Sequence, residues 1–288
     1  MRAVFLGTGT SHGVPVVGCP CPVCRSSDPR DSRYRASLLV RGDGGERILV
    51  DPGPEFRLQA LRAGIDRLDA VLVTHAHADH IHGLDDVRPL TREGPLPVWA
   101  NREARVELEV RFSYAFDPPQ RGGGVPRIRL PELPPEGVRV GGIRVLPVPV
   151  LHGILPILGF RLGNFAYLTD CSGIPDSSRP ILKGVEILVL GALRERPHPT
   201  HFSISEAADA ARSLGAREAW ITHICHDHSH EELEAICSGL SSPGFDLRPA
   251  FDGLELDIGI HPGNGHLCGQ HRGHGHGAGG VARSARQN

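Results

Sequence analysis

The sequence lacks any run of about 18 consecutive apolar residues, the length that a membrane-spanning helix needs. It also lacks a signal-peptide pattern, because Met1 to Phe5 run directly into a strand-like segment with no long apolar stretch behind a charged start. Charge of one sign is not in excess: 31 Lys and Arg residues stand against 33 Asp and Glu residues, for a net charge of −2. We therefore expect a cytoplasmic protein with no membrane partner. Without a strong positive field, nucleic acid is not expected as a partner either.

A disulfide framework is also missing. The chain has seven cysteines, an odd number, and three of them lie within Cys19-Pro20-Cys21-Pro22-Val23-Cys24. Three thiols this close cannot all pair with one another, whereas three thiolates on one zinc ion are common, with a fourth ligand supplied from elsewhere. We expect a structural zinc in a reducing compartment. His226 is the best candidate for the fourth ligand, and Cys225 is its rival.

Histidine, by contrast, is abundant, with 17 residues, and three of them fall in Thr74-His75-Ala76-His77-Ala78-Asp79-His80. This segment follows the apolar run Ala70 to Val73, so a strand delivers it into a turn. Alternate residues of an extended segment point the same way, which lets His75 and His77 share one ion. Asp79 and His80, where the chain turns into a helix, are aimed differently and can hold a second ion. Imidazole with carboxylate suits zinc, iron or manganese.

Three isolated polar residues downstream stand where an apolar strand-like run stops. His152 follows residues 145–151, Asp170 follows 165–169, and His223 follows 219–222. Strand ends are where α/β folds place their chemistry. Each residue alone is as readily a turn residue as a ligand, but the set complements the pattern at residues 75–80.

The order His-x-His-x-Asp-His, then His, Asp and His, resembles the metallo-β-lactamase superfamily over roughly residues 1–258. The resemblance implies an α/β fold of the αββα sandwich type, with two packed mixed β-sheets and helices outside. It implies one metal on His75, His77 and His152, and a second on Asp79, His80 and His223, with Asp170 bridging. Asp51, at the end of another strand-like run, is expected to orient a ligand histidine rather than to react.

The cysteine loop narrows the resemblance. Together with Gly7-Thr8-Gly9-Thr10-Ser11-His12-Gly13, residues 169–175 and residues 221–226, it resembles the PhnP-like phosphoribosyl 1,2-cyclic phosphate phosphodiesterases, relatives of tRNase Z. That group implies a homodimer that hydrolyses a small phosphodiester, with water activated between two zinc or manganese ions. Catalytic roles are expected for Asp79 and for His201, the latter as general acid or as a cation facing the phosphate. Arg194 and Arg196 are candidates for holding a second substrate phosphate.

Three alternatives stay open at this point. One is another hydrolase on the same site, such as a thioesterase or lactonase, and a second is a tRNase Z-type ribonuclease. The Pro- and Gly-rich stretch 118–142 is short and only modestly basic for the RNA-binding arm that such a nuclease carries. The third is a non-catalytic accessory protein of cofactor biosynthesis. The complete His and Asp set argues against lost catalysis.

The remaining pattern predicts the organisation of the chain. Strands are expected at 2–6, 35–41, 46–51, 69–73, 96–99, 143–150, 158–162, 165–169, 185–190, 217–222, 246–250 and 254–258, and helices at 55–63, 101–110, 203–213 and 230–238. Residues 1–258 form the expected hydrolase domain. Residues 259–288, rich in Gly and His and free of Asp and Glu, are expected to be a disordered tail. The short Gly7-x-Gly9 motif does not support a dinucleotide fold, because Pro15 and the cysteine loop stand where the helix would begin.

Overall fold

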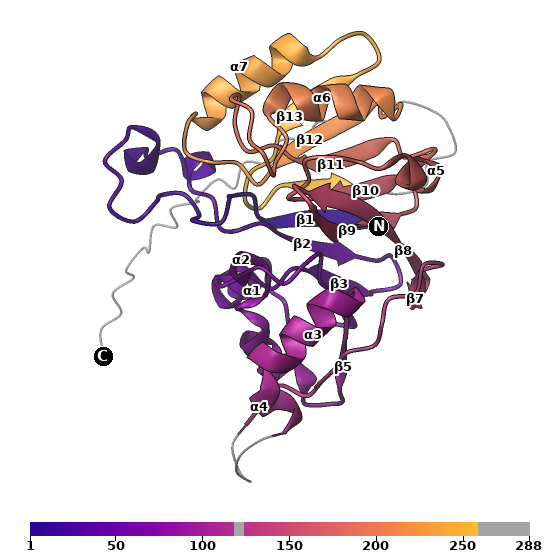
Figure 1. Ribbon diagram of the computed structural model, residues 1–288. Coiled ribbons are helices and arrows are strands. Elements are labelled where there is room, and N and C mark those ends of the chain that lie inside the picture. The colour runs from indigo at the N-terminus through magenta and orange to yellow at the C-terminus, as the bar shows by residue number, and fades with distance from the viewer. Residues whose placement is uncertain (118–123, 259–288) are drawn as a thin grey trace, which may run out of the picture.

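Two seven-stranded mixed sheets pack face to face in the computed structural model, which describes residues 1–117 and 124–258 (Figure 1). The first sheet has the order β14-β1-β2-β3-β4-β5-β6, and its strands β3 to β6 run parallel. Its strands are β1 (Arg2–Gly7), β2 (Ser37–Arg41), β3 (Arg47–Val50), β4 (Ala70–Leu72), β5 (Leu96–Trp99), β6 (Ile128–Arg129) and β14 (Glu255–Asp257).

The second sheet has the order β13-β12-β11-β10-β9-β8-β7, with an antiparallel half and a parallel half. Its strands are β7 (Val138–Val140), β8 (Ile143–His152), β9 (Leu155–Leu162), β10 (Phe165–Leu168), β11 (Ile187–Gly191), β12 (Glu218–Thr222) and β13 (Asp246–Pro249). The parallel strands β10 to β12 are buried on both faces over most of their length, so their sequences read as largely apolar runs rather than as alternating ones.

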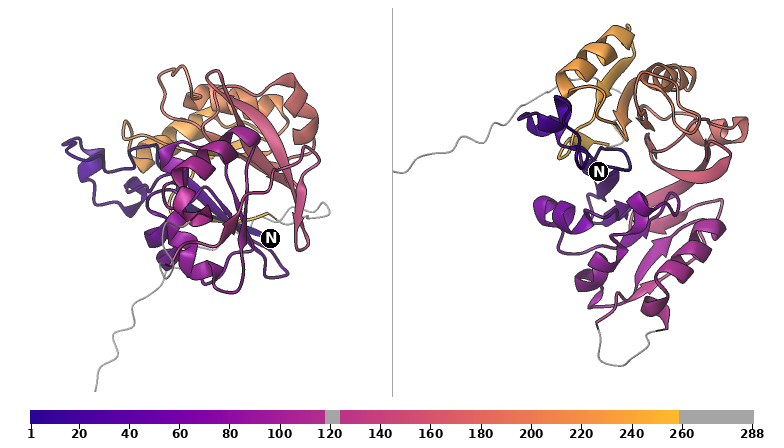
Figure 2. Two further views of the ribbon diagram at one scale, coloured as in Figure 1. Left: turned by 60° about the horizontal axis from the view of Figure 1, so that its bottom comes forward. Right: turned by 60° about the vertical axis from the view of Figure 1, so that its left-hand side comes forward.

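Helices cover the outer face of each sheet (Figures 1 and 2). The first sheet carries α1 (Phe56–Ala63), α2 (Ala78–Ile81), α3 (Arg102–Arg111) and α4 (Ser113–Phe116), and the second carries α5 (Arg179–Leu182), α6 (Ile204–Ser213) and α7 (His230–Leu240). Both longer helices of the second sheet begin with a complete capping box, Ser203 with Glu206 and Ser229 with Glu232. The expected αββα sandwich is therefore the observed fold.

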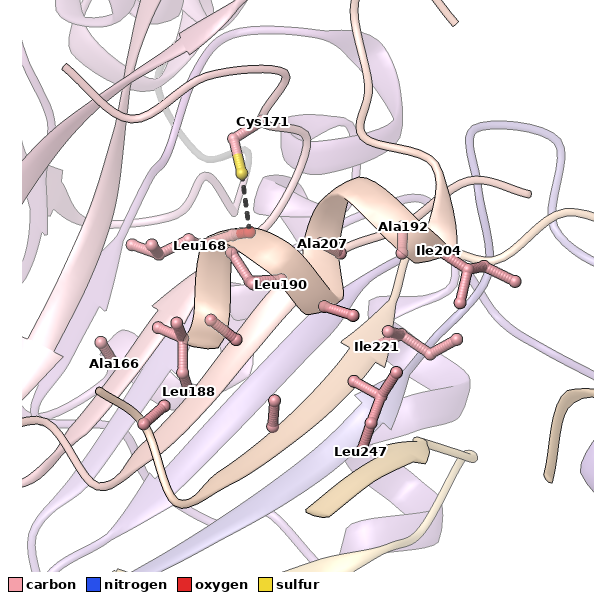
Figure 3. Close-up of a cluster of buried hydrophobic side chains, with 14 of the residues drawn as sticks. Ala166, Leu168, Cys171, Leu188, Leu190, Ala192, Ile204, Ala207, Ile221 and Leu247 are labelled. Carbon is pink, nitrogen blue, oxygen red and sulfur yellow. Dashed lines mark hydrogen bonds between the residues drawn. The ribbon is translucent and has the colours of Figure 1, made fainter. Parts of the chain in front are cut away.

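Three apolar clusters hold these layers together. The central one lies between the sheets and includes Phe5, Phe160 and Phe165, all fully buried. A second cluster packs the first sheet under α1 and α3. The third packs the second sheet under α6 and α7, and Figure 3 shows how Ile204 and Ala207 of α6 lie over the strand side chains of Leu190 and Ile221. The strand ends are thus anchored in rigid, well-packed material on both sides.

The expected strands and helices are all present, with ends that differ by a few residues. The differences are short elements. β6 and β7 lie in the stretch expected to be a Pro- and Gly-rich connection, and α4 and α5, of four residues each, were not expected. Four 3-10 segments add to these: Val23–Arg25, Pro29–Asp31, Leu84–Thr91 and Asp176–Ser178. The expected disordered tail at 259–288 lies outside the described residues.

The loop after β1 joins the two sheets. Gly9 pairs with Arg35 beside the first sheet and with Ile224 beyond β12 of the second sheet. A Cβ atom at Gly9 would lie 2.7 Å from the carbonyl oxygen of Arg33, so only glycine permits this approach. No helix follows Gly9, in agreement with the rejection of a dinucleotide-binding loop. The segment that comes next carries the cysteines and extends outward beside α7 (Figure 1, indigo).

Candidate metal centre

Ends of strands from both sheets converge on one polar cluster. His75 and His77 follow β4, Asp79 and His80 lie on α2, His152 ends β8, and Asp170 and His223 follow β10 and β12. Asp51, Asp170 and His223 are the three non-glycine residues with positive φ in residues 1–117 and 124–258. Backbone in this left-handed region is strained for side chains other than glycine and is tolerated where the surroundings fix it. All three strained residues therefore sit at the same site.

The side chains form two groups of candidate ligands. The ligand atoms of His75, His77 and His152 lie within 4.8 Å of one another. The same holds for the second group, which consists of Asp79, His80, Asp170 and His223. A third group, His152, Asp170 and His201, overlaps both. The first two groups contain the residues that the resemblance assigns to two ions, and the number of ions stays a prediction.

Asp170 reaches both groups. Its Oδ2 lies 3.3 Å from His80 Nε2, 3.2 Å from His223 Nε2 and 4.0 Å from His75 Nε2. Its backbone is held by β11, where a Cβ atom at Gly191 would lie 2.6 Å from the Asp170 nitrogen. This placement supports the expected bridging role.

Asp51 orients two of the histidines, as the resemblance implies. Its carboxylate accepts hydrogen bonds from the Thr74 amide and hydroxyl at 2.8 and 2.7 Å and from His80 Nδ1 at 2.8 Å. Because the Thr74 hydroxyl proton goes to Asp51, His75 Nδ1 must donate to that hydroxyl, at 2.9 Å. In the neutral form that binds a metal, both imidazoles are therefore protonated on Nδ1 and have Nε2 facing the centre. A single buried carboxylate sets the tautomers of two candidate ligands.

His152 is oriented by a residue that the sequence did not point to. Its Nδ1 donates to the backbone carbonyl of Thr200 at 2.8 Å, which again leaves Nε2 free to bind a metal. Because the acceptor is a main-chain oxygen, which every residue type has, this contact could not be predicted from the sequence. The loop between β11 and α6 thus contributes directly to the centre.

The buried carboxylates of the centre favour the binding of cations. Burial alone would lower the pKa of His80, but the Asp170, Asp51 and Asp79 carboxylates raise it well above its usual range. Nε2 of His75, His80 and His223 is buried and has no hydrogen-bond partner. Buried carboxylates crowded among unpartnered, correctly oriented imidazole nitrogens are what divalent ions neutralise and ligate. The residues fit divalent metals, while the choice of zinc or manganese and the number of ions stay predictions.

His201 lies against this centre but belongs to a loop. Its ring stacks on that of His223, with centroids 4.9 Å apart, and lies 4.7 Å from the ring of His152. Burial lowers the pKa of His201 to about 3, so its imidazole is neutral at pH 7. The expected position beside the reacting group is therefore supported, and the alternative role as a cation is not.

Arg194 and Arg196, the candidates for binding a second substrate phosphate, lie in different surroundings. Arg196 Nη2 pairs with Asp227 at 2.8 Å, beside a polar cavity lined by Cys21, His226 and neighbouring loop residues. This ion pair links the β11–α6 loop to the β12–α7 loop, and it engages one nitrogen of the Arg196 guanidinium. Nε of Arg194 is buried without a partner. Substrate binding by either arginine stays a prediction, with Arg196 the weaker of the two.

The cysteine loop folds onto His226. The Sγ atoms of Cys19, Cys21 and Cys24 each lie 3.4 Å from His226 Nδ1. With Zn–S near 2.3 Å and Zn–N near 2.0 Å, a tetrahedral site needs S···N separations of about 3.5 Å. The rival ligand Cys225 is not part of this cluster and is buried. The geometry favours His226 as the fourth ligand, and zinc binding at this cluster stays a prediction.

Hydrogen bonds favour thiolate at the loop. The Cys24 amide and His226 lower the pKa of Cys21 to about 6, and Cys24 Sγ accepts from the Val16 amide at 3.3 Å. Burial, by contrast, raises the pKa of Cys24 to about 11, so one bound cation is needed to keep all the thiols deprotonated together.

A buried guanidinium supports the loop that serves both clusters. Arg33, 1 % exposed, donates to the carbonyl oxygens of Cys225 and His228 at 3.1 and 3.4 Å. It pairs with Asp31 at 3.3 Å, and Asp31 accepts from the His230 amide at the start of α7. Arg33 therefore fixes the segment between His223 and α7. Sequence alone does not reveal this role, because nothing in the pattern separates Arg33 from its neighbours Arg30 and Arg35, which are only partly buried.

Comparisons with known proteins agree with this centre. A family model described as the beta-lactamase superfamily domain matches residues 46–224. A solved structure described as a new diphosphatase from the PhnP family is 42% identical, with a TM-score of 0.81, and the match covers 90% of this chain and 98% of that one. The chain belongs to the metallo-β-lactamase superfamily, and it has that superfamily's hydrolase fold.

Two other likenesses are more limited. The octanoyltransferase of Porphyromonas gingivalis is 41% identical over 90% of this chain, but the match spans only 52% of that protein, about half its length. Its name therefore assigns no transferase chemistry to the shared half. Zinc-bound PqqB from Methylobacterium extorquens has a TM-score of 0.71 at 18% identity, over 90% of this chain and all of that one, and this likeness shows the fold alone. In the described residues no helix is long and apolar enough to cross a membrane.

Proposed function

We propose that this protein is a metal-dependent phosphodiesterase that hydrolyses a small phosphodiester, most specifically a cyclic phosphate on ribose such as 5-phosphoribosyl 1,2-cyclic phosphate. The observation that carries the proposal is a neutral imidazole, His201, stacked beside a complete set of His and Asp ligands. The ligand set suits hydrolysis, and the extra imidazole suits a leaving oxygen. The likeness to a structure described as a diphosphatase of the PhnP family supports hydrolysis at phosphorus.

Two divalent ions at this centre would make water nucleophilic near neutral pH and would neutralise charge on the phosphate oxygens. The chain supplies the rest. Asp170 and Asp79 provide the carboxylates, and Asp51 and the Thr200 carbonyl keep the imidazoles oriented. Water attacks phosphorus in line, and the P–O bond to the leaving oxygen breaks. His201 donates a hydrogen bond to that oxygen, and since its imidazole is neutral, the leaving group takes its proton from solvent.

Diphosphate hydrolysis is a second candidate, because the 42%-identical structure is described as a diphosphatase. Attack at phosphorus is shared by both reactions, and only the leaving group differs. The octanoyl name of the other relative makes acyl thioester cleavage a third activity to test.

The experiment is a substrate panel with metal-loaded protein. It includes 5-phosphoribosyl 1,2-cyclic phosphate, 2′,3′-cyclic nucleotides, bis(4-nitrophenyl) phosphate, a nucleoside diphosphate, an octanoyl thioester and a lactone. The proposal predicts the highest kcat/KM on a cyclic ribose phosphate, and a loss of at least about 100-fold in the Asp170→Asn variant. Turnover of the thioester or the lactone without any diester turnover would overturn it.

A further inference from the structure

A second imidazole stands beside His201 and has no role so far. His198 lies on the same loop between β11 and α6, and its ring centroid is 5.1 Å from that of His201. Since His201 in turn lies against His152 and His223, the four rings form a continuous group that runs from the loop into the metal centre. His198 is its outermost, half-buried member.

Hydrogen bonds define the tautomer of His198. The Thr200 backbone N–H, which can only donate, points to His198 Nδ1 at 3.3 Å, and the Thr200 hydroxyl lies 3.2 Å from the same atom. Nδ1 is therefore an acceptor, and the neutral ring carries its proton on Nε2. Within the described part of the chain no hydrogen bond engages Nε2, and that atom is not sealed in the interior. The ring thus presents a fixed N–H donor with no protein partner.

The same turn is fastened to the metal centre. The carbonyl of Thr200 accepts from His152 Nδ1, so the backbone of one residue links His198 to a candidate ligand. A Cβ atom at Gly153 would lie 2.9 Å from Thr200 Cγ2, which shows how closely the β8–β9 turn packs on the loop. The position of the His198 ring relative to the centre is therefore set by structure, as a substrate-binding group requires.

We propose that His198 is a second substrate-binding residue, whose Nε2–H donates to a phosphate oxygen of the bound substrate on the side of His201 away from the ligand cluster. The inference rests on the proposed function, because it takes the substrate to be a phosphate ester. Two neutral donors on adjacent rings can bind two oxygens of one phosphate group, or oxygens of neighbouring phosphates.

Two substitutions separate the two nitrogens of the ring. His198→Asn retains an acceptor near the Nδ1 position, so the Thr200 turn persists while the Nε2 donor is lost. His198→Gln places an amide donor near the Nε2 position and leaves the Thr200 amide unpaired. The probe is inorganic phosphate, titrated into metal-loaded protein by calorimetry, with KM and kcat on bis(4-nitrophenyl) phosphate and metal content measured in parallel.

We expect His198→Asn to weaken phosphate binding and to raise KM by about tenfold each, the effect of one hydrogen bond to a charged group, with unchanged metal content. His198→Gln should bind phosphate within about threefold of the native protein. His228→Asn is the matched control: it removes an imidazole that pairs with Glu195 on the same loop at 3.1 Å, and it should bind phosphate as the native protein does.

Native phosphate affinity in His198→Asn would overturn the inference. A loss of phosphate affinity in His198→Gln alone would show that His198 only holds the turn. Metal loss in His198→Asn, or an equal loss of phosphate affinity in both variants, would also overturn the inference, because the effect would then not follow the Nε2 donor. Phosphate binding by the native protein without turnover of any diester would contradict the proposed function alone, and the comparison of variants would still decide the role of His198. A native protein that binds no phosphate would contradict both.

Discussion

The two metal-ligating clusters are built in opposite ways, although one loop serves both. The His and Asp centre draws its members from strand ends of both sheets, and its histidines are held by Asp51 and by the Thr200 carbonyl. The cysteine cluster takes three of its four members from an irregular segment whose 3-10 turn, Val23–Arg25, buries no residue. The fourth member, His226, lies in the loop between β12 and α7, which also carries His223.

We infer that the fold alone preorganises the His and Asp centre, whereas the cysteine cluster is assembled by the ion that it binds. The packed sheets position the His and Asp centre, so folding creates it before any ion binds. The cysteine segment has little apolar burial to order it, so its shape depends on the ion that its thiols hold. Metal removal should therefore leave the first cluster in place and loosen the second.

The largest expected loss of stability comes from substituting Arg33, the residue that supports the loop shared by both clusters. Arg33→Met leaves Asp31 buried without its partner and frees the carbonyls of Cys225 and His228, so we expect a loss of about 3–5 kcal/mol in the free energy of unfolding. Arg30→Met is the control, since that arginine makes exposed ion pairs worth at most about 1 kcal/mol. Urea unfolding measures both. Equal losses would show that Arg33 is no special support.

Asp252 holds the two ends of the segment that carries the cysteines, so its titration tests how firmly that segment is attached. It accepts hydrogen bonds from Thr8 and Tyr34, and burial raises its pKa to about 7, above the unfolded value of about 3.9. The folded state thus keeps a proton that the unfolded state has lost, so this contribution is complete below pH 4 and disappears as the pH rises through 7. The linkage amounts to about 4 kcal/mol at most.

The measurement is the free energy of unfolding between pH 4 and 9 for the native protein and for Asp252→Asn. We expect the difference between the two curves to change between pH 4 and about pH 8 and to be constant above that. A constant difference at every pH would mean that Asp252 is ionised throughout in the folded protein.

The preorganised cluster is tested at Asp51. Asp51→Asn disturbs the orientation of His75 and His80, and we expect metal affinity at that centre to fall by about 10–100-fold while the cysteine zinc stays bound. Competition with a chromophoric chelator measures this. Asp176→Asn, an exposed aspartate paired with Arg179, is the control and should match the native affinity. Loss of both metals at once would contradict the independence of the two clusters.

The assembled cluster is tested by Cys21→Ser. The metal content should fall from about three to about two equivalents per chain, and the segment around residues 16–25 should become sensitive to protease while the overall fold persists. Two equivalents in the native protein, with no change in the variant, would show that the cysteine cluster holds no ion.

Much of the fold and of the ligand set could be predicted because both leave local marks. Buried strands read as apolar runs, and a polar residue at the end of each run gave His152, Asp170 and His223. Elements such as β6 and α4 escaped because two to four residues carry no measurable period. The strained backbone at Asp51, Asp170 and His223 leaves no mark in sequence either.

The supporting contacts could not be predicted for a related reason: they depend on long-range geometry or on main-chain atoms. Thr200 acts through its carbonyl, and Arg33 differs from the partly buried Arg30 only in how deeply the chain buries it. The sequence likewise does not show that the fold places Asp227 beside Arg196, and substrate binding by this arginine stays a prediction.

The most direct test is hydrolysis of 5-phosphoribosyl 1,2-cyclic phosphate by metal-loaded protein in oxygen-18 water, followed by phosphorus NMR. The account predicts one phosphate product with the heavy oxygen on phosphorus, at a rate that the Asp170→Asn variant nearly abolishes. No hydrolysis of this or any other diester by the loaded protein, or heavy oxygen found only on carbon, would contradict it.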